Sequence, residues 1–204
     1  MFQVHNYLLY DTETREAVLI DTGKDPQAVL DFLTDNQLDL KLLLYTHTHL
    51  DHVEGHSTIR RAYPDLPAWM HMEDQFWVDA LPMQAEMFGM KTPEAPVITG
   101  YVQPGQVFTL ENCTLEARFC PGHTPGGISY FAKEAPFVFT GDTIFAGSIG
   151  RTDFPRGDYK TLMNSIETQI MTLPDDTLIY SGHGDVTTVG TERQSNPFVL
   201  EYMH

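Results

Sequence analysis

The chain has 204 residues, of which 28 are acidic and 12 are basic, so its formal net charge is −16. Apolar residues make up 42 % of the chain, which excludes a disordered polypeptide. The acid excess disfavours nucleic acid as a partner, because phosphate groups require a basic surface. We expect no membrane insertion, since no apolar run is long enough for a spanning helix, and no secretory signal, since no basic region opens the chain. Two cysteines are too few for a disulfide scaffold, so we expect a cytoplasmic protein. The length suits a single domain over residues 1–204.

Strands and helices alternate in the first half of the sequence. Apolar runs predict strands at 2–10 and 16–21, which a polar turn joins as a hairpin. Asp25 and Pro26 are typical of the start of a helix. The apolar face of that helix is expected at Ala28, Val29, Phe32 and Leu33. The remaining elements are a strand at 41–46, a helix at 54–62, a strand at 68–71 and a helical stretch at 73–90 that is broken or kinked at Pro82.

The second half repeats this alternation. Strands are expected at 107–110, 114–120, 128–131, 137–140 and 177–181, and an amphipathic helix at 158–171. Such a mixture predicts a layered α/β protein with mixed sheets. Cys113 and Cys120 lie seven residues apart in one expected strand and face opposite sides, so we expect both to be reduced packing residues.

Four candidate metal ligands follow the third expected strand within six residues. They are His47, His49, Asp51 and His52 in the run T-H-T-H-L-D-H. An extended backbone directs His47, His49 and Asp51 to one side, whereas a helix would place His49 opposite the other two. A loop at the end of a strand therefore gathers the most ligands. Imidazole and carboxylate groups suit zinc, manganese or ferrous iron.

Three further candidates occur where an expected strand ends. His123 lies in C-P-G-H-T-P-G-G, Asp142 in T-G-D-T and His183 in S-G-H-G. Because one metal takes three or four protein ligands, seven candidates fit two divalent ions, with Asp142 as the bridge. Two ions about 3.5–4 Å apart would hold a shared water as hydroxide near neutral pH. The other histidines lie in no such motif and are expected to be structural or exposed: His5, His56, His71 and His204.

The order T-H-x-H-x-D-H, P-G-H-T-x-G, T-G-D and S-G-H resembles the metallo-β-lactamase superfamily over nearly the whole chain. The resemblance implies an α/β fold, a four-layer αββα sandwich of two mixed β-sheets flanked by helices, with the metals at one edge of the sheets. It also implies two ligand sets joined by Asp142: His47, His49 and His123 for one ion, and Asp51, His52 and His183 for the other. Zinc is the first expectation for both ions, with iron or manganese as alternatives.

Further residues narrow this resemblance. Asp142 stands where the β-lactam-hydrolysing enzymes use cysteine, and His49 where flavodiiron proteins use glutamate. The stretches 141–154 and 182–193, the latter followed by N-P-F, resemble the short glyoxalase II-like hydrolases. They imply a thioester hydrolase of the hydroxyacylglutathione hydrolase type. Persulfide dioxygenases, which use one iron, share G-R-T-D-F but usually read A-H-D-Y where this chain reads G-H-G-D. A hydrolase of another ester or of a lactone is a third alternative.

Two residues receive roles beyond metal binding. Asp51 is expected to be catalytic as well as a ligand, because its carboxylate can orient the attacking water and accept its proton. Arg151 is a candidate for binding a substrate carboxylate, the alternative being a pair with Asp153 or Asp158 that braces the loop. Asp153 could instead support a metal-bound histidine. The stretch 76–90 is expected in the core or in a subunit contact rather than as a cap over the pocket. The expected partner is a small-molecule thioester, and the sequence does not specify its acyl group or its thiol carrier. A homo-oligomer is compatible with the sequence.

Overall fold

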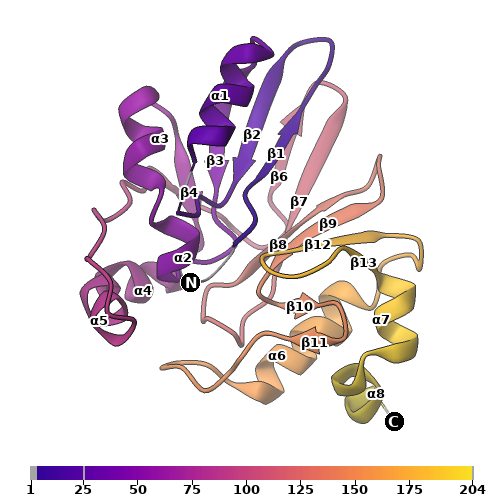
Figure 1. The fold of residues 1–204 in the computed structure, drawn as a ribbon. Coiled ribbons are helices and arrows are strands. Elements are labelled where there is room, and N and C mark those ends of the chain that lie inside the picture. Colours follow the sequence, from indigo (N-terminus) through magenta and orange to yellow (C-terminus); the bar gives the residue numbers. More distant parts are fainter. Residues whose placement is uncertain (1–3, 25, 204) are drawn as a thin grey trace. The chain divides into compact units, whose positions relative to one another are not determined.

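The computed structural model describes residues 4–24 and 26–203. The chain forms two compact units, the first made of residues 1–102 and 110–112 and the second of residues 103–109 and 113–204. Each unit contains one large β-sheet with helices packed on it (Figure 1). A single domain over 1–204 stays a prediction.

The sheet of the first unit has five strands in the order β1-β2-β3-β4-β5. β1 and β2 form the predicted antiparallel hairpin, and the strands from β2 to β5 run parallel to one another. The sheet is therefore mixed, as predicted. The bounds are β1 Tyr7–Tyr10, β2 Glu16–Ile20, β3 Asp39–Leu44, β4 Ala68–Met70 and β5 Gly100–Tyr101. β1 is shorter than the predicted strand, since residues 4–6 are not extended in a ladder and residues 2 and 3 lie outside the described residues.

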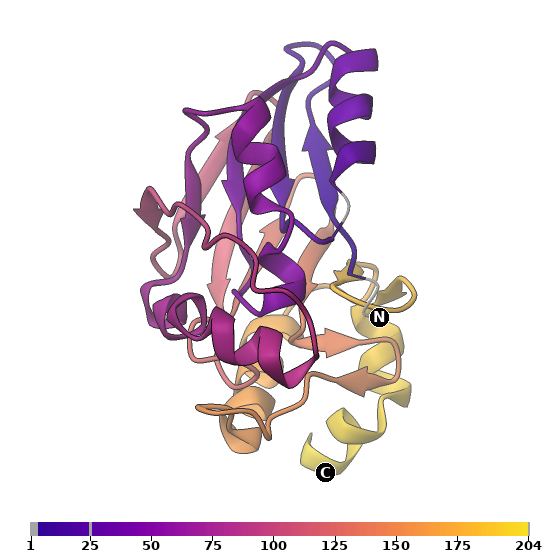
Figure 2. The ribbon, with the colours of Figure 1, turned by 60° about the vertical axis from the view of Figure 1, so that its left-hand side comes forward.

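Two helices, α1 (Gln27–Asp35) and α3 (His56–Ala62), lie side by side against this sheet (Figures 1 and 2). Leu33 of α1 and Ile59 of α3 are buried in one core with Leu19 and Leu43 of the sheet. Burial of this apolar surface stabilises the layer.

The apolar face predicted for α1 is partly wrong. Ala28 and Phe32 are exposed, whereas Val29 and Leu33 pack on the core together with Leu30. Residues i, i+1 and i+4 of a helix share one face, and this triplet faces the sheet. The predicted cap residue Asp25 lies outside the described residues, and Pro26 directly precedes the helix.

The helix predicted at 54–62 begins two residues later, at His56, after a break at Gly55. A short helix, α2 (Leu50–Val53), precedes it, and α3 follows. The amide of Gly55 donates to the carbonyl of Thr22 at 3.1 Å, and a Cβ on Gly55 would lie 2.2 Å from the carbonyl oxygen of Gly23. The chain therefore bends where it touches the end of β2, which the helical periodicity alone does not indicate.

The stretch 73–90 folds as three short helical pieces. They are η1 (Met72–Asp74), α4 (Gln75–Asp79) and α5 (Leu81–Met87). The predicted break is confirmed, since α4 ends at Asp79 and α5 begins at Leu81. Pro82 lies in the first turn of α5, where no intrahelical amide bond is required.

The sheet of the second unit has six strands in the order β13-β12-β9-β8-β7-β6. β12 runs parallel to β9, while β9, β8 and β7 are antiparallel neighbours, so this sheet is also mixed. The bounds are β6 Val107–Leu110, β7 Cys113–Phe119, β8 Ile128–Ala132, β9 Phe137–Gly141, β12 Leu178–Ser181 and β13 Thr187–Thr188. A two-stranded hairpin, β10 (Ile144–Phe145) and β11 (Ser148–Ile149), follows β9.

The predicted helix 158–171 is α6 (Tyr159–Ser165) continued by a π-helical turn, Ile166–Ile170. Asp158 caps it through a 2.7 Å bond from the amide of Thr161. Its apolar face lies in the core of this unit. The sequence did not predict β5, β10, β11, β13 or the helices α7 (Val189–Ser195) and α8 (Pro197–Met203). None of the helices in the described part of the chain combines the length and the apolar composition that a membrane crossing requires.

Both cysteines are free thiols, as predicted, with Cys113 half-buried and Cys120 buried. Burial raises the pKa of the Cys120 thiol to about 11, so this side chain stays protonated and apolar in character near neutral pH.

The loop between β7 and β8 depends on Gly122. Its φ is +131°, and a Cβ there would lie 2.2 Å from the amide nitrogen of Leu162 in α6. We predict that Gly122→Ala lowers the free energy of unfolding by about 1–3 kcal/mol more than Gly105→Ala, since Gly105 has a φ of +76° but open space around its Cβ position. Denaturant titration of both variants measures this difference, and equal losses would show that the close approach to α6 is unimportant.

Candidate metal centre

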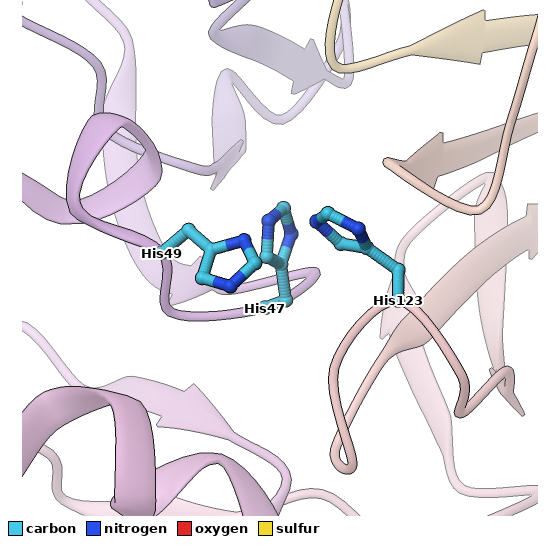
Figure 3. A group of neighbouring side chains, drawn as sticks. All are labelled: His47, His49 and His123. Atoms are coloured by element: carbon cyan, nitrogen blue, oxygen red, sulfur yellow. The ribbon is translucent and has the colours of Figure 1, made fainter. Parts of the chain in front are cut away.

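The histidine-rich run lies in the first unit, where β3 ends and α2 begins. His49 precedes α2 in extended conformation, and Asp51 and His52 lie within that helix. The imidazoles are buried, and the ring centroids of His47 lie 4.9 Å from His49 and 3.9 Å from His52. Figure 3 shows the rings of His47 and His49 turned toward each other at this loop. The predicted loop at the end of a strand is confirmed, except that its last two candidates begin a helix.

Asp21, at the end of β2, anchors this loop from the neighbouring strand. Its carboxylate, almost fully buried, accepts from the amide of Thr46 (2.8 Å), the hydroxyl of Thr46 (2.7 Å) and Nδ1 of His52 (2.9 Å). Asp21 has a φ of +59°, an uncommon value for a side chain other than glycine. Asp21 is not among the residues predicted from the sequence, although it ends the apolar run 16–21 as the ligand candidates end theirs.

The stretch 72–87 braces the other side of the loop. Buried Asp74 accepts from the amide of Thr48 at 2.8 Å, and Gln84 accepts from the amide of Leu50 at 2.8 Å. Gln84 also donates to the carbonyl of Trp77, whose buried ring packs edge-on against His49 with centroids 4.4 Å apart. The stretch thus supports the site through its buried residues, while other apolar members of it are exposed: Met72, Met83 and Met87.

The other three candidates lie in the second unit, each just after a strand. His123 follows β7, Asp142 follows β9 and His183 follows β12. Nε2 of His123 lies 3.6 Å, and Nε2 of His183 3.5 Å, from the same oxygen, Oδ2 of Asp142. These separations are too long for good hydrogen bonds. They match two ligand atoms that share one ion, since tetrahedral ligands at 2.0–2.1 Å from zinc lie ~3.4 Å apart.

Three of the histidines have their ring orientation fixed by a bond at Nδ1. Nδ1 of His123 donates to the carbonyl of Arg151 at 2.7 Å, and Nδ1 of His52 donates to Asp21. Nδ1 of His47 donates to the hydroxyl of Thr46 at 3.1 Å, because that hydroxyl spends its own proton on Asp21. A neutral ring protonated at Nδ1 carries its lone pair at Nε2, so Nε2 is the nitrogen available to bind a metal. The donor set therefore fits divalent ions.

The side chain of Arg151 forms the bracing pair. Its guanidinium donates two 2.7 Å bonds to Asp153 and stacks 3.8 Å over the ring of Phe154. The bonds from Arg151 hold the pKa of the Asp153 carboxyl below its usual range. The alternative pairing with Asp158 is wrong, because Asp158 caps α6. The hydrogen-bond acceptor for His123 is likewise the carbonyl of Arg151 rather than the carboxylate of Asp153.

Glu192 of α7 supports the segment that follows Asp142. This buried carboxylate accepts from the amide of Gly147 and from the side chains of Thr187 and Asn196 at 2.6–2.8 Å. Asn196 also donates to the carbonyl of Ser148 at 3.0 Å. Because α7 was not predicted, this support could not be located from the sequence.

The remaining histidines have structural surroundings, as expected. His56 is buried, while Nδ1 of His71 accepts from the amide of Glu73 and His5 contacts the hydroxyl of Tyr7. His204 lies outside the described residues.

Two mixed α/β sheets with histidine and aspartate clusters at their strand ends define the class of metal-dependent hydrolases with this layered fold. The model of the metallo-β-lactamase superfamily matches residues 2–183 of the chain. The chain belongs to that superfamily, whose members bind divalent metals through such clusters.

Similarity to individual proteins extends over nearly the whole chain. Hydroxyacylglutathione hydrolase GloC of Haemophilus influenzae is 40 % identical over 97 % of this chain and 93 % of its own. The crystal structure of the BLEG-1 B3 metallo-β-lactamase has a TM-score of 0.89 at 34 % identity, covering 97 % of this chain and 94 % of that one. The di-iron-bound form of TTHA1623 has a TM-score of 0.86 at 33 % identity, covering 96 % and 95 %. The expected fold of mixed sheets flanked by helices is confirmed.

We predict that Asp21→Asn weakens zinc binding about 10- to 100-fold, the range typical when the support of a metal-bound histidine is lost. An amide offers one acceptor oxygen, and its NH₂ group would face the donors that Asp21 now satisfies. Competition with a chromophoric chelator measures the dissociation constant. Asp31→Asn, at an exposed acceptor of Gln27 in α1, is the matched control and should bind zinc as the unmodified chain does. Unchanged affinity in Asp21→Asn would contradict the anchoring role.

Proposed function

We propose that this member of the metallo-β-lactamase superfamily is a two-metal thioesterase of the hydroxyacylglutathione hydrolase type. The observation that carries the proposal is the 40 % identity to GloC over nearly the full length of both chains. The fixed imidazoles of the first unit and the cluster around Asp142 in the second unit support it, since both offer ligand atoms suited to divalent ions.

The proposed ligands form two sets. One set is His47, His49 and His123, the residues drawn in Figure 3. The other set is Asp51, His52 and His183. Asp142 would lie between the two ions, and its carboxylate is suited to this role because both His123 and His183 face the same oxygen. Zinc is the first choice of metal, with iron or manganese as alternatives.

In the proposed mechanism, two bound divalent ions would lower the pKa of a shared water so that hydroxide is available near neutral pH. The carboxylate of Asp51 orients that water and accepts its proton. The hydroxide oxygen adds to the thioester carbonyl carbon, the carbon–sulfur bond breaks with its electron pair on sulfur, and the proton held by Asp51 passes to that sulfur. The products are a carboxylic acid and a thiol. Thiolate is a good leaving group, so the reaction needs no strong general acid.

The surroundings of the proposed site support a small-molecule substrate. Trp77 shields the ring of His49, and the bonds at Nδ1 keep the imidazoles oriented without the substrate. The net charge of −16 gives no basic surface for nucleic acid. The two free thiols support a cytoplasmic location.

A mono-iron persulfide dioxygenase is the second candidate, favoured by the stretch G-R-T-D-F at 150–154. Metal analysis combined with an activity pair tests both candidates. We predict two metal equivalents and hydrolysis of S-D-lactoylglutathione, without oxygen uptake in the presence of glutathione persulfide. One iron per chain with oxygen uptake would overturn the thioesterase. Hydrolysis of a chromogenic β-lactam in place of any thioester would also overturn it.

His49→Ala provides the matching variant for this test. The loss of a proposed ligand should lower metal content and reduce thioester turnover by more than about 100-fold. His71→Ala removes another imidazole of the first unit outside the proposed ligand sets and should retain both. Full metal content together with a full rate in His49→Ala would contradict the ligand assignment.

Arg151 is the proposed contact for a substrate carboxylate. Its guanidinium already lies in a fixed bidentate geometry with Asp153, and its side chain is half exposed. We predict that Arg151→Ala raises KM for an acidic thioester about 10-fold and leaves kcat nearly unchanged, as expected for a group that binds substrate and transition state equally. Asp153→Asn keeps the arginine and should change KM much less. An unaltered KM in Arg151→Ala would leave the residue with its bracing role alone.

A further inference from the structure

A buried chain of polar side chains lies beneath the histidine-rich loop, outside the proposed ligands. Nδ1 of His56 lies 2.7 Å from the hydroxyl of Tyr45, which lies 3.1 Å from the hydroxyl of Thr22. The hydroxyl of Thr22 donates to the carbonyl of His52 at 3.3 Å. Tyr45 and Thr22 are fully buried, and His56 is only 3 % exposed. All these residues belong to the first unit.

The donors and acceptors of this chain run in one direction. The amide of Val97 donates to Nε2 of His56 at 3.0 Å, so the proton of a neutral ring is at Nδ1 and is donated to Tyr45. Thr22 spends its hydroxyl proton on the carbonyl of His52 and therefore accepts from Tyr45. Each link requires the one before it.

The apolar surroundings favour this direction of the hydrogen bonds, because it leaves no hydroxyl of the network unsatisfied. Tyr45 belongs to the same buried core as Val53 and Ile59, where an unsatisfied hydroxyl would be costly. Burial lowers the pKa of His56 to about 4, which keeps the ring neutral near pH 7. The neutral ring is the form that can accept from Val97 and donate to Tyr45 at the same time.

The chain ends on the backbone that carries a proposed ligand. Thr22 also donates its amide to the carbonyl of His52 at 2.8 Å, and its own carbonyl accepts from Gly55. The imidazole of His52 is held separately by Asp21. Asp21 therefore fixes the ring of His52, and the neighbouring Thr22 fixes the carbonyl of His52.

We propose that Tyr45 and His56 are positioning residues for the metal centre, which act through Thr22 to orient His52. The proposal rests on the proposed function, since it takes His52 as a metal ligand. The plainer role for such a network is to stabilise the core of the first unit, and the two roles differ in what happens to metal affinity.

The test compares zinc dissociation constants, measured by chelator competition on the full chain. Tyr45→Phe and His56→Leu interrupt the hydrogen bonds that lead from His56 to Thr22. Both variants should weaken zinc binding about 10-fold, the low end of the range for residues that support a ligand. His56→Asn places an amide donor near the position of Nδ1 and should restore affinity to within about threefold of the unmodified chain. Tyr130→Phe removes the hydroxyl of another fully buried tyrosine, in the second unit, and should leave affinity unchanged.

A second readout uses the metal-free protein. The amide of Thr22 should exchange with solvent deuterium about 10-fold faster in Tyr45→Phe than in Tyr130→Phe, because its bond to the carbonyl of His52 has lost support. If Tyr45→Phe does not fold, Thr22→Val, which removes a hydroxyl at nearly constant volume, takes its place in both measurements.

The outcomes separate this proposal from the proposed function. The positioning role is wrong if Tyr45→Phe and His56→Leu bind zinc within twofold of the unmodified protein. It is also wrong if His56→Asn does not restore zinc affinity. Both readouts are independent of thioester turnover. A chain that binds two zinc ions but cleaves no thioester would therefore overturn the proposed function and leave the positioning role standing or falling on zinc affinity.

Discussion

The histidine-rich loop depends on the hydrogen bonds that the buried carboxylate of Asp21 accepts from it. A buried charge is costly unless hydrogen bonds surround it, and Asp21 receives bonds from the backbone and side chain of Thr46 and from His52. The left-handed φ of Asp21 persists because these bonds and the parallel pairing of β2 with β3 over-determine it. The register between two strands therefore sets the position of the loop that follows the second strand.

The same arrangement recurs in the second unit. His123 is oriented by the backbone of Arg151, and the hydroxyl of Ser181 donates to the carbonyl of His183 at 2.7 Å. The carboxylate of Glu192 holds the hairpin that follows Asp142. In each case a strand end delivers the candidate ligand and a hydrogen bond fixes the ligand or the segment beside it, so less conformational entropy is left to lose when an ion binds.

The residue types and the strand ends of this site are visible in the sequence, but most of the residues that support them are not. Apolar runs mark where strands stop, and histidine and aspartate at those points reveal the ligand chemistry without knowledge of any contact. Asp74 and Gln84 sit 26 and 34 residues from their partners and read as ordinary polar residues of a helical stretch. The break at Gly55 has a similar cause, because it follows from a close approach to Gly23 that no local pattern records.

The carboxyl groups around the histidine clusters are stabilised in two different ways. The buried carboxyl groups of Asp21 and Glu192 accept hydrogen bonds from amide, hydroxyl and imidazole donors of the protein itself. At Asp142, Nε2 of His123 and Nε2 of His183 lie 3.6 Å and 3.5 Å from Oδ2, and imidazoles are neutral unless protonated. A neutral imidazole held by a bond at Nδ1 turns a lone pair toward its neighbours, so a half-buried carboxylate beside it gains stability from a cation between them. A divalent ion supplies that charge at neutral pH, and because it binds the folded arrangement alone, its binding free energy adds to the stability of the fold.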